Sequence, residues 1–547
     1  MARSGFRGVG AWLREGVWAI PLRRYLALLV TAALVTGIGF AVRSLTHDDR
    51  SCAPGVVRPA GSDECVGVST TDYAFGREQL ADTIRAIDRE NDSLTNRTDG
   101  SNDADDTDGE DGTAGYVTVA LFEPFTATDE DNLGDVLHEL QGAYLAQWKV
   151  NHDANGEGPP IRLVLANPGR TGAHWEHTVD QLERMTTTSD RLRAVTGIGL
   201  STEENTRAVK ELTRRGIPVV GTSITADSLA NGRQGSPEGL KPFPGLARTA
   251  PTNTDEARAL ASFADVAADK AVLVYDDPGD PYTLTLQASF EKLLTGSRYQ
   301  PWPFTPLADR TKEGTTANDF RQIRELVCDT APGVNTILFA GRHTQLRQFI
   351  NALGERGCQQ REFTILTGDD ASYLTGDRKL DPEALKHGVS VRYSALAHPD
   401  AWLKDPPRTG GSAADARELT ELLGAAQANR TGRSGRPSPI GAIDLEDGQL
   451  IIAYDAMRLT VEGIREATPR GRSAPTLADV GDEWTLIKGS SGRVNGASGW
   501  ICLDNYGNPY DKAVPIVELT PDRHARFVEI AWPTGRPPEK DCLPPSS

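Results

Sequence analysis

Hydroxyl side chains follow two apolar segments of the sequence, at points where helices begin. Ser201 follows "AVTGIGL" and makes with Glu204 the S-x-x-E spacing of a helix capping box. Thr222 and Ser223 end the next apolar segment, "IPVVGTS". Because N–H groups and hydroxyls at a helix N-terminus can bind a carboxylate, these positions indicate an anion-binding site. The alternative is structural: a helix cap for Ser201, and simple loop hydroxyls for Thr222 and Ser223.

Motifs of common catalytic sites are missing from the sequence. It contains no P-loop, no G-x-G-x-x-G after the first predicted strand, no H-E-x-x-H helix and no G-x-S-x-G elbow. His343 and the loop aspartates could form an acid–base dyad, but no nucleophile stands at a matching position. The six cysteines lack the C-x-x-C spacing of zinc or redox sites. We expect a protein that is not an enzyme, with no catalytic residue, cofactor or metal site.

The elements that would carry these residues alternate between apolar strands and amphipathic helices. One series predicts strands at 116–125, 161–169, 194–200 and 217–223, with helices at 133–150, 179–185 and 204–216. A second series predicts helices at 255–268, 283–294 and 345–357, with strands at 270–277, 335–341 and 362–370. Such alternation predicts two parallel sheets covered by helices and a ligand cleft between two lobes.

The N-terminal region contains one apolar run, residues 25–42, which reaches the roughly 18 residues at which a helix begins to span a bilayer. Arginines precede this run, whereas Asp48 and Asp49 follow it, so the positive-inside bias predicts a cytoplasmic tail at 1–24 and a single-pass anchor at 25–42. A cleaved signal peptide is the alternative, but only the weak "GIG" at 37–39 offers a cleavage site. We expect the remainder of the chain to be extracytoplasmic, held at the cell membrane.

Six cysteines, an even number, fit an oxidising compartment. They fall into near neighbours, and the most local pairing predicts the disulfides Cys52–Cys65, Cys328–Cys358 and Cys502–Cys542. Cys52 has a rival interpretation as a lipidated residue. The preceding "DDRS" lacks the small and apolar residues of a lipoprotein processing site, which disfavours that interpretation.

The acidic balance of the chain, a formal charge of −18 over 547 residues, disfavours nucleic acid as a partner. Much of this charge lies at 101–115, a stretch rich in Asp and Gly that we interpret as a flexible linker, because it lacks the spacing and closing Glu of a calcium loop. Residues 43–100 carry one amphipathic helix, with Leu80, Ile84 and Ile87 at helical spacing. We expect this part to form an extracytoplasmic stalk or a lid.

Five segments resemble, in order, those of type I periplasmic binding proteins, the substrate-binding proteins of ABC transporters typified by receptors for leucine, isoleucine and valine. They are "GLSTEENTRAVKELTRRGIPVVGTSITADSL", "PGLARTAPTNTDEARALASF", "AVLVYDDPGDPYTLTLQASFEKLL", "IIAYDAMRLTVEGIREA" and "GASGWICLDNYGNPYDKAVPIVEL". The resemblance covers roughly 116–519 and implies a hinged, two-lobed α/β fold. It implies crossings between the lobes near Arg248, His398 and Arg472. The lobes are then 116–247 with 397–471, and 248–396 with 472–519, followed by a C-terminal tail at 520–547.

The same resemblance implies which residues meet a ligand. Tyr282, in "DDPGDPY", falls where the family places an aromatic residue on the ligand, and Asp369 or Asp370 falls where it places an acidic residue, more often glutamate, for the ammonium group. Arg342 stands where an aromatic residue is expected; in the cleft it would favour an anionic group, and the alternative is a solvated loop charge. The expected ligand site is Ser201, Thr202, Thr222, Ser223, Tyr282, Arg342, Asp369 and Asp370.

The expected function is that of a membrane-anchored solute-binding protein. The resemblance implies a small amino-acid or amide-like ligand in the interlobe cleft and an ABC permease as partner. Two alternatives remain: a sensor that reports to another membrane or regulatory partner, and a protein-interaction module whose cleft binds no small molecule.

Overall fold

The computed structural model describes residues 50–99, 115–153, 158–232, 240–307, 316–430, 432–433, 435–469 and 474–545. The chain divides into two compact units, residues 1–52 and residues 53–547, and only the second is discussed below. Among the described residues, no helix combines the length and apolar character needed to cross a membrane. The expected tail and anchor at 1–42, and positions 101–114 of the expected linker, lie outside the described residues.

The first lobe is built on a mostly parallel sheet in the order β2-β3-β5-β4-β6-β7-β8. Neighbours from β5 to β8 are parallel, whereas β3 runs antiparallel to both β2 and β5. Every residue of β4 is buried, as expected for a strand covered on both faces. The strands of this lobe are β2 (Val56–Val57), β3 (Val66–Ser69), β4 (Val117–Phe122), β5 (Ile161–Asn167), β6 (Leu192–Gly197), β7 (Val219–Gly221) and β8 (Leu246–Arg248). Another short strand, β1 (Ser51–Ala53), spans the boundary between the units.

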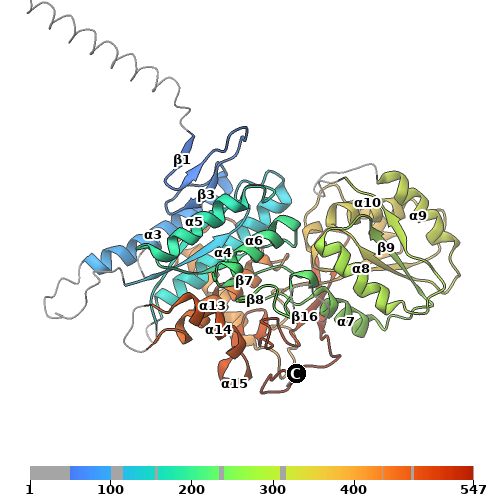
Figure 1. The fold of residues 1–547 in the computed structure, drawn as a ribbon. Coiled ribbons are helices and arrows are strands. Elements are labelled where there is room, and N and C mark those ends of the chain that lie inside the picture. Colours follow the sequence, from blue (N-terminus) through green and yellow to red (C-terminus); the bar gives the residue numbers. More distant parts are fainter. Residues whose placement is uncertain are drawn as a thin grey trace, which may run out of the picture. The chain divides into compact units, whose positions relative to one another are not determined.

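Helices pack on both faces of this sheet (Figure 1): α3 (Ala81–Asp99), α4 (Glu130–Asn151), α5 (Trp175–Thr187), α6 (Glu203–Arg214) and α13 (Gln449–Glu466). Short 3-10 turns, η1 (Glu78–Leu80) and η2 (Asp227–Leu229), join these elements. Helix α13 is buried on nearly all sides and lies along α4. A Cβ at Gly142 of α4 would come within 2.3 Å of the Leu450 carbonyl oxygen, so only glycine allows the two helices to approach this closely.

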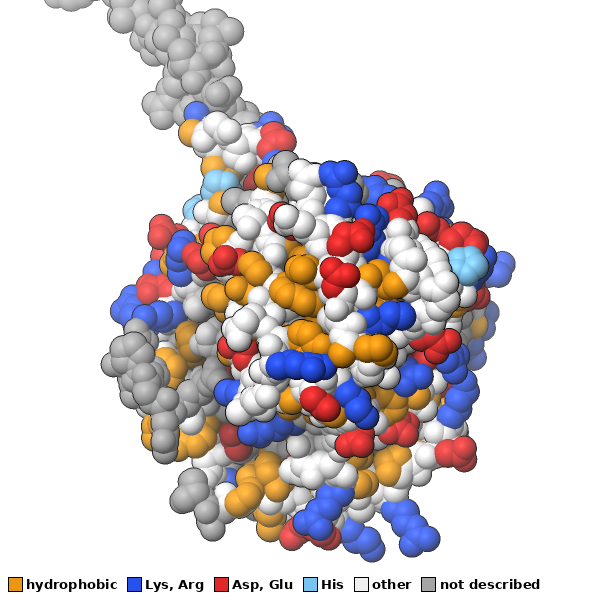
Figure 2. All heavy atoms as spheres, turned by 90° about the vertical axis from the view of Figure 1, so that its right-hand side faces the viewer, with side chains coloured by type: hydrophobic (Ala, Val, Ile, Leu, Met, Phe, Trp, Pro, Cys, Tyr) orange, Lys and Arg blue, Asp and Glu red, His pale blue; other side chains and the backbone are white. Residues whose placement is uncertain are grey.

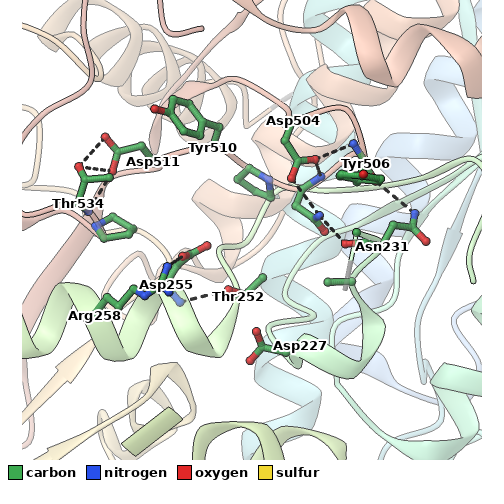
Figure 3. Close-up of a pocket in the computed structure, with 15 residues that line it drawn as sticks. Asp227, Asn231, Thr252, Asp255, Arg258, Asp504, Tyr506, Tyr510, Asp511 and Thr534 are labelled. Carbon is green, nitrogen blue, oxygen red and sulfur yellow. Dashed lines mark hydrogen bonds and ion pairs between the residues drawn. The ribbon is translucent and has the colours of Figure 1, made fainter. Parts of the chain in front are cut away.

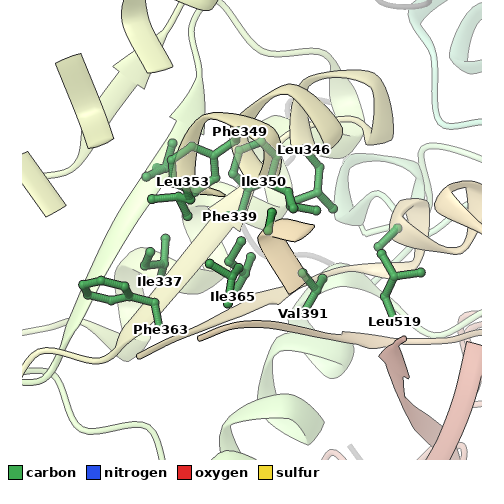
Figure 4. Close-up of a cluster of buried hydrophobic side chains, with 14 of the residues drawn as sticks. Ile337, Phe339, Leu346, Phe349, Ile350, Leu353, Phe363, Ile365, Val391 and Leu519 are labelled. Atoms are coloured by element: carbon green, nitrogen blue, oxygen red, sulfur yellow. The ribbon is translucent and has the colours of Figure 1, made fainter. Parts of the chain in front are cut away.

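The second lobe is built on a sheet in the order β10-β9-β11-β12-β13-β16-β17, parallel up to β13 and antiparallel beyond it. Alternate side chains of β9 enter two hydrophobic clusters, one on each face of the sheet. Figure 4 shows the cluster in which Phe339 and Ile365 pack under Phe349 of α10. The strands are β9 (Ala271–Asp276), β10 (Trp302–Phe304), β11 (Thr336–Ala340), β12 (Phe363–Thr367), β13 (Val389–Ser394), β16 (Val514–Leu519) and β17 (Ala525–Ala531). The helices are α7 (Asn253–Ala264), α8 (Pro281–Leu293), α9 (Ala317–Asp329), α10 (His343–Gly354), η3 (Asp369–Leu374) and α11 (Pro382–Lys386).

The chain passes between the lobes three times, and the third passage comes later than expected. It lies between β15 (Gly499–Ile501) and β16, not near Arg472. Helix α14 (Leu477–Glu483) contacts α13 and β6, and Trp484 packs on Gly463 and donates a hydrogen bond to the carbonyl oxygen of Gly245. These contacts hold residues 474–503 to the first lobe. Residues 474–503 also contain η4 (Trp484–Leu486), α15 (Gly489–Gly492) and β14 (Val494–Gly496), and α12 (Ala413–Ala428) precedes α13 in the chain.

The N-terminal piece expected as a stalk or lid is part of the first lobe. Strand β3 pairs with β5, and α3 packs on α4 and β5. Asn91 of α3 is buried and donates to the carbonyl oxygen of Leu163, 2.8 Å away, while Thr83 donates to that of Ile440. The reason is the buried edge of the sheet: without β3, the polar backbone groups of β5 would have no partner there.

The C-terminal segment expected as a tail is also structured. Strand β17 completes the second sheet by pairing with β16. The disulfide Cys502–Cys542 ties the end of the chain back, and Cys328–Cys358 links α9 to the segment after α10; both are the expected pairings. Cys65 is also disulfide-bonded. Figure 2 shows that Lys and Arg are interspersed with Asp and Glu on the face it presents.

Candidate functional site

The loops after strands of both lobes meet around one small cavity. From the first lobe come the loops after β6 and β7, and from the second come those after β9, β11 and β12. The cavity measures about 10 Å³, which is room for about one water molecule, so side chains fill this point between the lobes. It is lined by Gly199, Leu200, Ser201, Ser223, Thr225, Tyr282, Arg342, Asp369, Asp370, Tyr373 and Gln449. We call this set the cleft site.

Six of the eight expected ligand residues line the cleft site, and Thr202 and Thr222 do not. Helix α6 begins at Glu203, and Thr202 is its N-cap, with Oγ1 accepting from the N–H of Asn205 at 3.2 Å. The helix cap expected at Ser201 therefore lies one residue later, at Thr202. The hydroxyl oxygen of Ser201 accepts instead from the N–H of Ala226, which fixes the loop after β7. Thr222 is buried beside Glu139.

Arg342 fills the centre of the cleft site. Its Nε donates to Asp280 at 2.9 Å and its Nη1 to Asp370 at 2.8 Å, both in the second lobe. The guanidinium also lies 4.5 Å from the ring centroid of Tyr282, a cation–π contact. Burial acts to lower the pKa of Arg342, but these two carboxylates reverse the effect and raise it. The alternative of a solvated loop charge is wrong, because Arg342 is only 7% exposed.

The two aspartates after β12 have opposite electrostatic environments. Burial raises the pKa of Asp369 to about 7, and the neighbouring charge of Asp370 adds to this. Burial acts in the same sense on Asp370, but Arg342 and His343 hold its pKa below the usual range. At neutral pH, Asp370 is therefore an ionised partner of Arg342, whereas Asp369 can take up a proton. Asp369 also meets the first lobe, since Thr225 Oγ1 lies 3.3 Å from its Oδ1.

Two buried glutamates beside the cleft site were not among the expected residues. Glu123 follows β4, and Glu139 lies on α4; their carboxyl groups pack against the glycine-containing end of β6, where Gly199 donates its N–H to Glu123 at 3.0 Å. Burial raises the pKa of Glu139 to about 7, and burial with the proximity of Glu139 raises that of Glu123 well above its usual value. Glu123 follows a parallel strand just as Ser201 follows a neighbouring one, and this is the signal that could have found it.

Ser223, one of the first-lobe hydroxyls expected to bind a ligand carboxylate, instead hydrogen-bonds one of these glutamates. Ser223 Oγ lies 3.1 Å from Glu139 Oε1 and 2.7 Å from Gln449 Oε1. On the opposite lobe, Glu256 is fully buried near Asp369, and burial raises its pKa well above the usual value. Carboxyl groups thus outnumber cations around the cleft site. Such surroundings favour a ligand that donates hydrogen bonds or carries positive charge.

A second pocket, of about 380 Å³, lies where the third interlobe segment passes (Figure 3). Asp504 and Asp511 line it, but Asp504 accepts the N–H groups of Tyr506 and Asn508, and Asp511 accepts from the Thr534 hydroxyl. These contacts shape the loop itself. None of the expected ligand residues lines this larger pocket, and we place the candidate site in the smaller cavity, because ligands of such sheets bind at the carboxyl ends of strands.

Comparisons with known proteins identify the fold. A scan against models of protein families and a search of curated proteins find no match. Similar solved structures include a leucine-binding protein, LivK, from Thermotoga maritima (TM-score 0.50, 16% identity, 76% of this chain and 98% of that one). Another is the branched-chain amino acid transporter substrate-binding protein LivJ of Streptococcus pneumoniae, in complex with isoleucine (0.50, 16%, 76% and 99%). A third is a solute-binding protein of an ABC transporter from Rhodopseudomonas palustris, in complex with 3,4-dihydroxybenzoic acid (0.51, 15%, 76% and 97%).

The likeness to these structures is one of fold, since the identities are low. All three are binding proteins by name, and at these identities the likeness gives the fold of this chain and not its role. The two sheets, the three passages between lobes and the site at the strand ends agree with the same architecture. The chain therefore has the two-lobed fold of the type I periplasmic binding proteins.

Proposed function

We propose that this protein is an extracytoplasmic solute-binding protein that closes its two lobes on a small ligand in the cleft site. The observation that carries the proposal is the convergence of polar side chains from both lobes on one buried point at the strand ends. Ser201 and Ser223 come from one lobe, and Tyr282, Arg342 and Asp369 from the other. A ligand at this point touches both lobes and can hold them together.

The ligand we propose is an amino acid or an amide-like solute. Asp369 and Glu139 can accept hydrogen bonds from an ammonium or amide group, whether or not each carries its proton. A carboxylate on the ligand can pair with Arg342 if that side chain exchanges Asp280 or Asp370 for it. The excess of acidic groups favours amides and cationic amino acids over dicarboxylic ones.

Entry of such a ligand requires a movement. A cavity of about 10 Å³ cannot take an amino acid, so the lobes must separate or Arg342 must leave its place. The same tight filling favours the second candidate function, a protein-interaction module that uses the outer surfaces of the lobes. That candidate predicts that no small solute changes the stability of the protein.

For the membrane topology of the protein, we propose a cytoplasmic tail at residues 1–24, a single-pass membrane anchor at 25–42 and an acidic linker at 101–115. The binding lobes then lie outside the membrane and deliver the ligand to an ABC-type permease. Sensing through another membrane partner is the alternative use of the same lobes. Permease and ATPase genes beside this one would support transport, whereas regulatory NTPase-like genes would support sensing.

A thermal-shift screen of residues 50–547 against amino acids, their amides and short dicarboxylates tests the proposal. A ligand at a hundred times its dissociation constant should stabilise the folded state by about 2.7 kcal/mol. The shift should shrink in Tyr282→Ala and Asp369→Asn when each is compared with its own unliganded melting temperature. A shift that both variants keep would place the ligand elsewhere, and a silent screen would favour the interaction module.

A further inference from the structure

Three side chains with metal-ligating atoms gather on the first lobe, outside the cleft site. Asp135 and His138 stand three residues apart on α4 and so share one helix face. Asp447 lies two residues before the start of α13. One ligand atom from each of the three lies within 4.8 Å of the other two. The packing of α4 along α13 therefore brings together possible metal ligands that are about 300 residues apart in the sequence.

We propose that Asp135, His138 and Asp447 bind a divalent transition-metal ion of the Zn²⁺ class. Imidazole nitrogen and carboxylate oxygen are both zinc ligands, and a site with three protein ligands leaves a coordination position open. The imidazole nitrogen favours Zn²⁺ over Mg²⁺ and Ca²⁺, which prefer oxygen ligands alone. This proposal does not depend on the identity of the proposed solute, although the site adjoins the cleft site, because Asp135 interacts with the hydroxyl of Tyr373.

Hydrogen bonds hold two of the proposed metal ligands, His138 and Asp447, in place. Asp447 Oδ2 hydrogen-bonds His138 Nδ1, and its other oxygen, Oδ1, accepts from the N–H of Gln449 at 2.9 Å. The orientation of the carboxylate is thus fixed before an ion binds, as is usual for metal ligands. The side chains of His138 and Asp447 are each 12% exposed, which leaves a path from solvent.

A second observation, at Asp135, supports a cation-binding site. Asp135 Oδ2 is shielded from solvent and has no hydrogen-bond partner. A buried carboxylate oxygen without a donor is unfavourable, and a metal ion would supply the missing partner. Asp444 adds a further negative charge near His138, so a divalent cation also relieves repulsion at this edge of the lobe.

The test uses the full-length chain, treated with EDTA and then freed of the chelator, and Zn²⁺ alone as the probe. Equilibrium dialysis with metal analysis should find about one Zn²⁺ per chain, bound more tightly than Mg²⁺ or Ca²⁺. His138→Ala and Asp447→Asn should each weaken binding at least about tenfold. Far-UV circular dichroism of the metal-free variants checks folding, and Asp447→Asn, which keeps its size, serves if His138→Ala fails to fold.

A matched control is His524→Ala, because His524 also pairs with a carboxylate, Glu446 at 3.0 Å, but belongs to no three-ligand group in the described residues. This variant should bind Zn²⁺ like the unmodified protein. Equal Zn²⁺ binding by His138→Ala, Asp447→Asn and the unmodified protein would overturn the proposal. So would an affinity for Mg²⁺ or Ca²⁺ equal to that for Zn²⁺, or no Zn²⁺ binding at all.

Discussion

Nη2 of Arg342 donates a hydrogen bond to the carbonyl oxygen of Ser201, 3.1 Å away, across the cleft between the lobes. The same guanidinium pairs with two carboxylates of its own lobe, so one side chain joins the strand ends of both sheets. Arg342 therefore acts as a latch, a side chain whose hydrogen bonds hold the first lobe to the second. A ligand that enters the cleft site must compete with this latch or build on it.

Replacing Arg342 should be strongly destabilising. In Arg342→Met, the buried carboxylate of Asp370 loses its main partner, and breaking a buried ion pair from one side costs about 3–5 kcal/mol. The double variant Arg342→Met/Asp370→Asn should recover part of this loss, because it no longer leaves an unpaired charge. Urea unfolding of residues 50–547 measures both. A loss below about 1 kcal/mol in the single variant would show that Arg342 is not a buried latch.

The raised pKa of Asp369 predicts a pH effect of definite sign. The folded protein holds the proton of Asp369 up to about pH 7, whereas the unfolded chain releases it near the ordinary value of 3.8. The folded state thus binds more protons between these values, and this contribution to stability is lost as the pH rises through about 7. Asparagine at position 369 cannot ionise.

The melting temperature of Asp369→Asn, relative to the unmodified protein, should therefore rise between about pH 5 and about pH 8. The lowered pKa of Asp370 acts at more acidic pH and leaves this comparison unaffected. A constant difference between the two proteins across that range would contradict the assignment of a raised pKa to Asp369.

A fragment that begins at Tyr116 should be much less stable than one that begins at Arg50. It lacks β3, which covers the edge of β5, and α3, whose Asn91 makes buried hydrogen bonds with the backbone of Leu163. Loss of a paired strand also exposes a sheet edge that promotes aggregation. Thermal unfolding and size-exclusion chromatography of the two fragments provide the comparison. Equal melting temperatures and monomeric behaviour would restore the interpretation of residues 43–100 as a stalk.

The membrane proposal predicts an uncleaved N-terminus. Mature protein should retain Met1 or Ala2 and stay with membranes after a carbonate wash, since residues 25–42 are long enough to span a bilayer. N-terminal sequencing and fractionation measure these properties. A mature N-terminus beyond about residue 39 would identify the segment as a cleaved signal.

Sequence periodicity predicted the alternation of strands and helices and the two lobes, because each element buries a continuous apolar face. Hydroxyl side chains that follow predicted strands also indicated Ser201 and Ser223, since parallel strands bring their carboxyl ends to one edge, whereas Arg342 was expected only from the family resemblance. Contacts between segments far apart in the sequence could not be predicted from periodicity. Neither the pairing of β3 with β5 nor the packing of Trp484 on Gly463 leaves a local pattern.

The acidic character of the cleft site could not be predicted from the sequence either, because it also depends on contacts between distant segments. Glu139 occupies a helical position between Val136 and Leu140, where a sequence pattern suggests a core face, and only the fold shows that this face meets Glu123 and Ser223. The charge state of Asp369 likewise depends on burial by two lobes, which no local window of sequence contains.

Calorimetric titration of residues 50–547 with the strongest ligand from the screen tests the central claim most directly. We predict one site per chain, an affinity at least about tenfold weaker in Asp369→Asn, and an unchanged affinity in Asp255→Asn, whose side chain lines the other pocket. Unchanged binding in Asp369→Asn together with a loss in Asp255→Asn would contradict the account and place the ligand in the pocket of Figure 3.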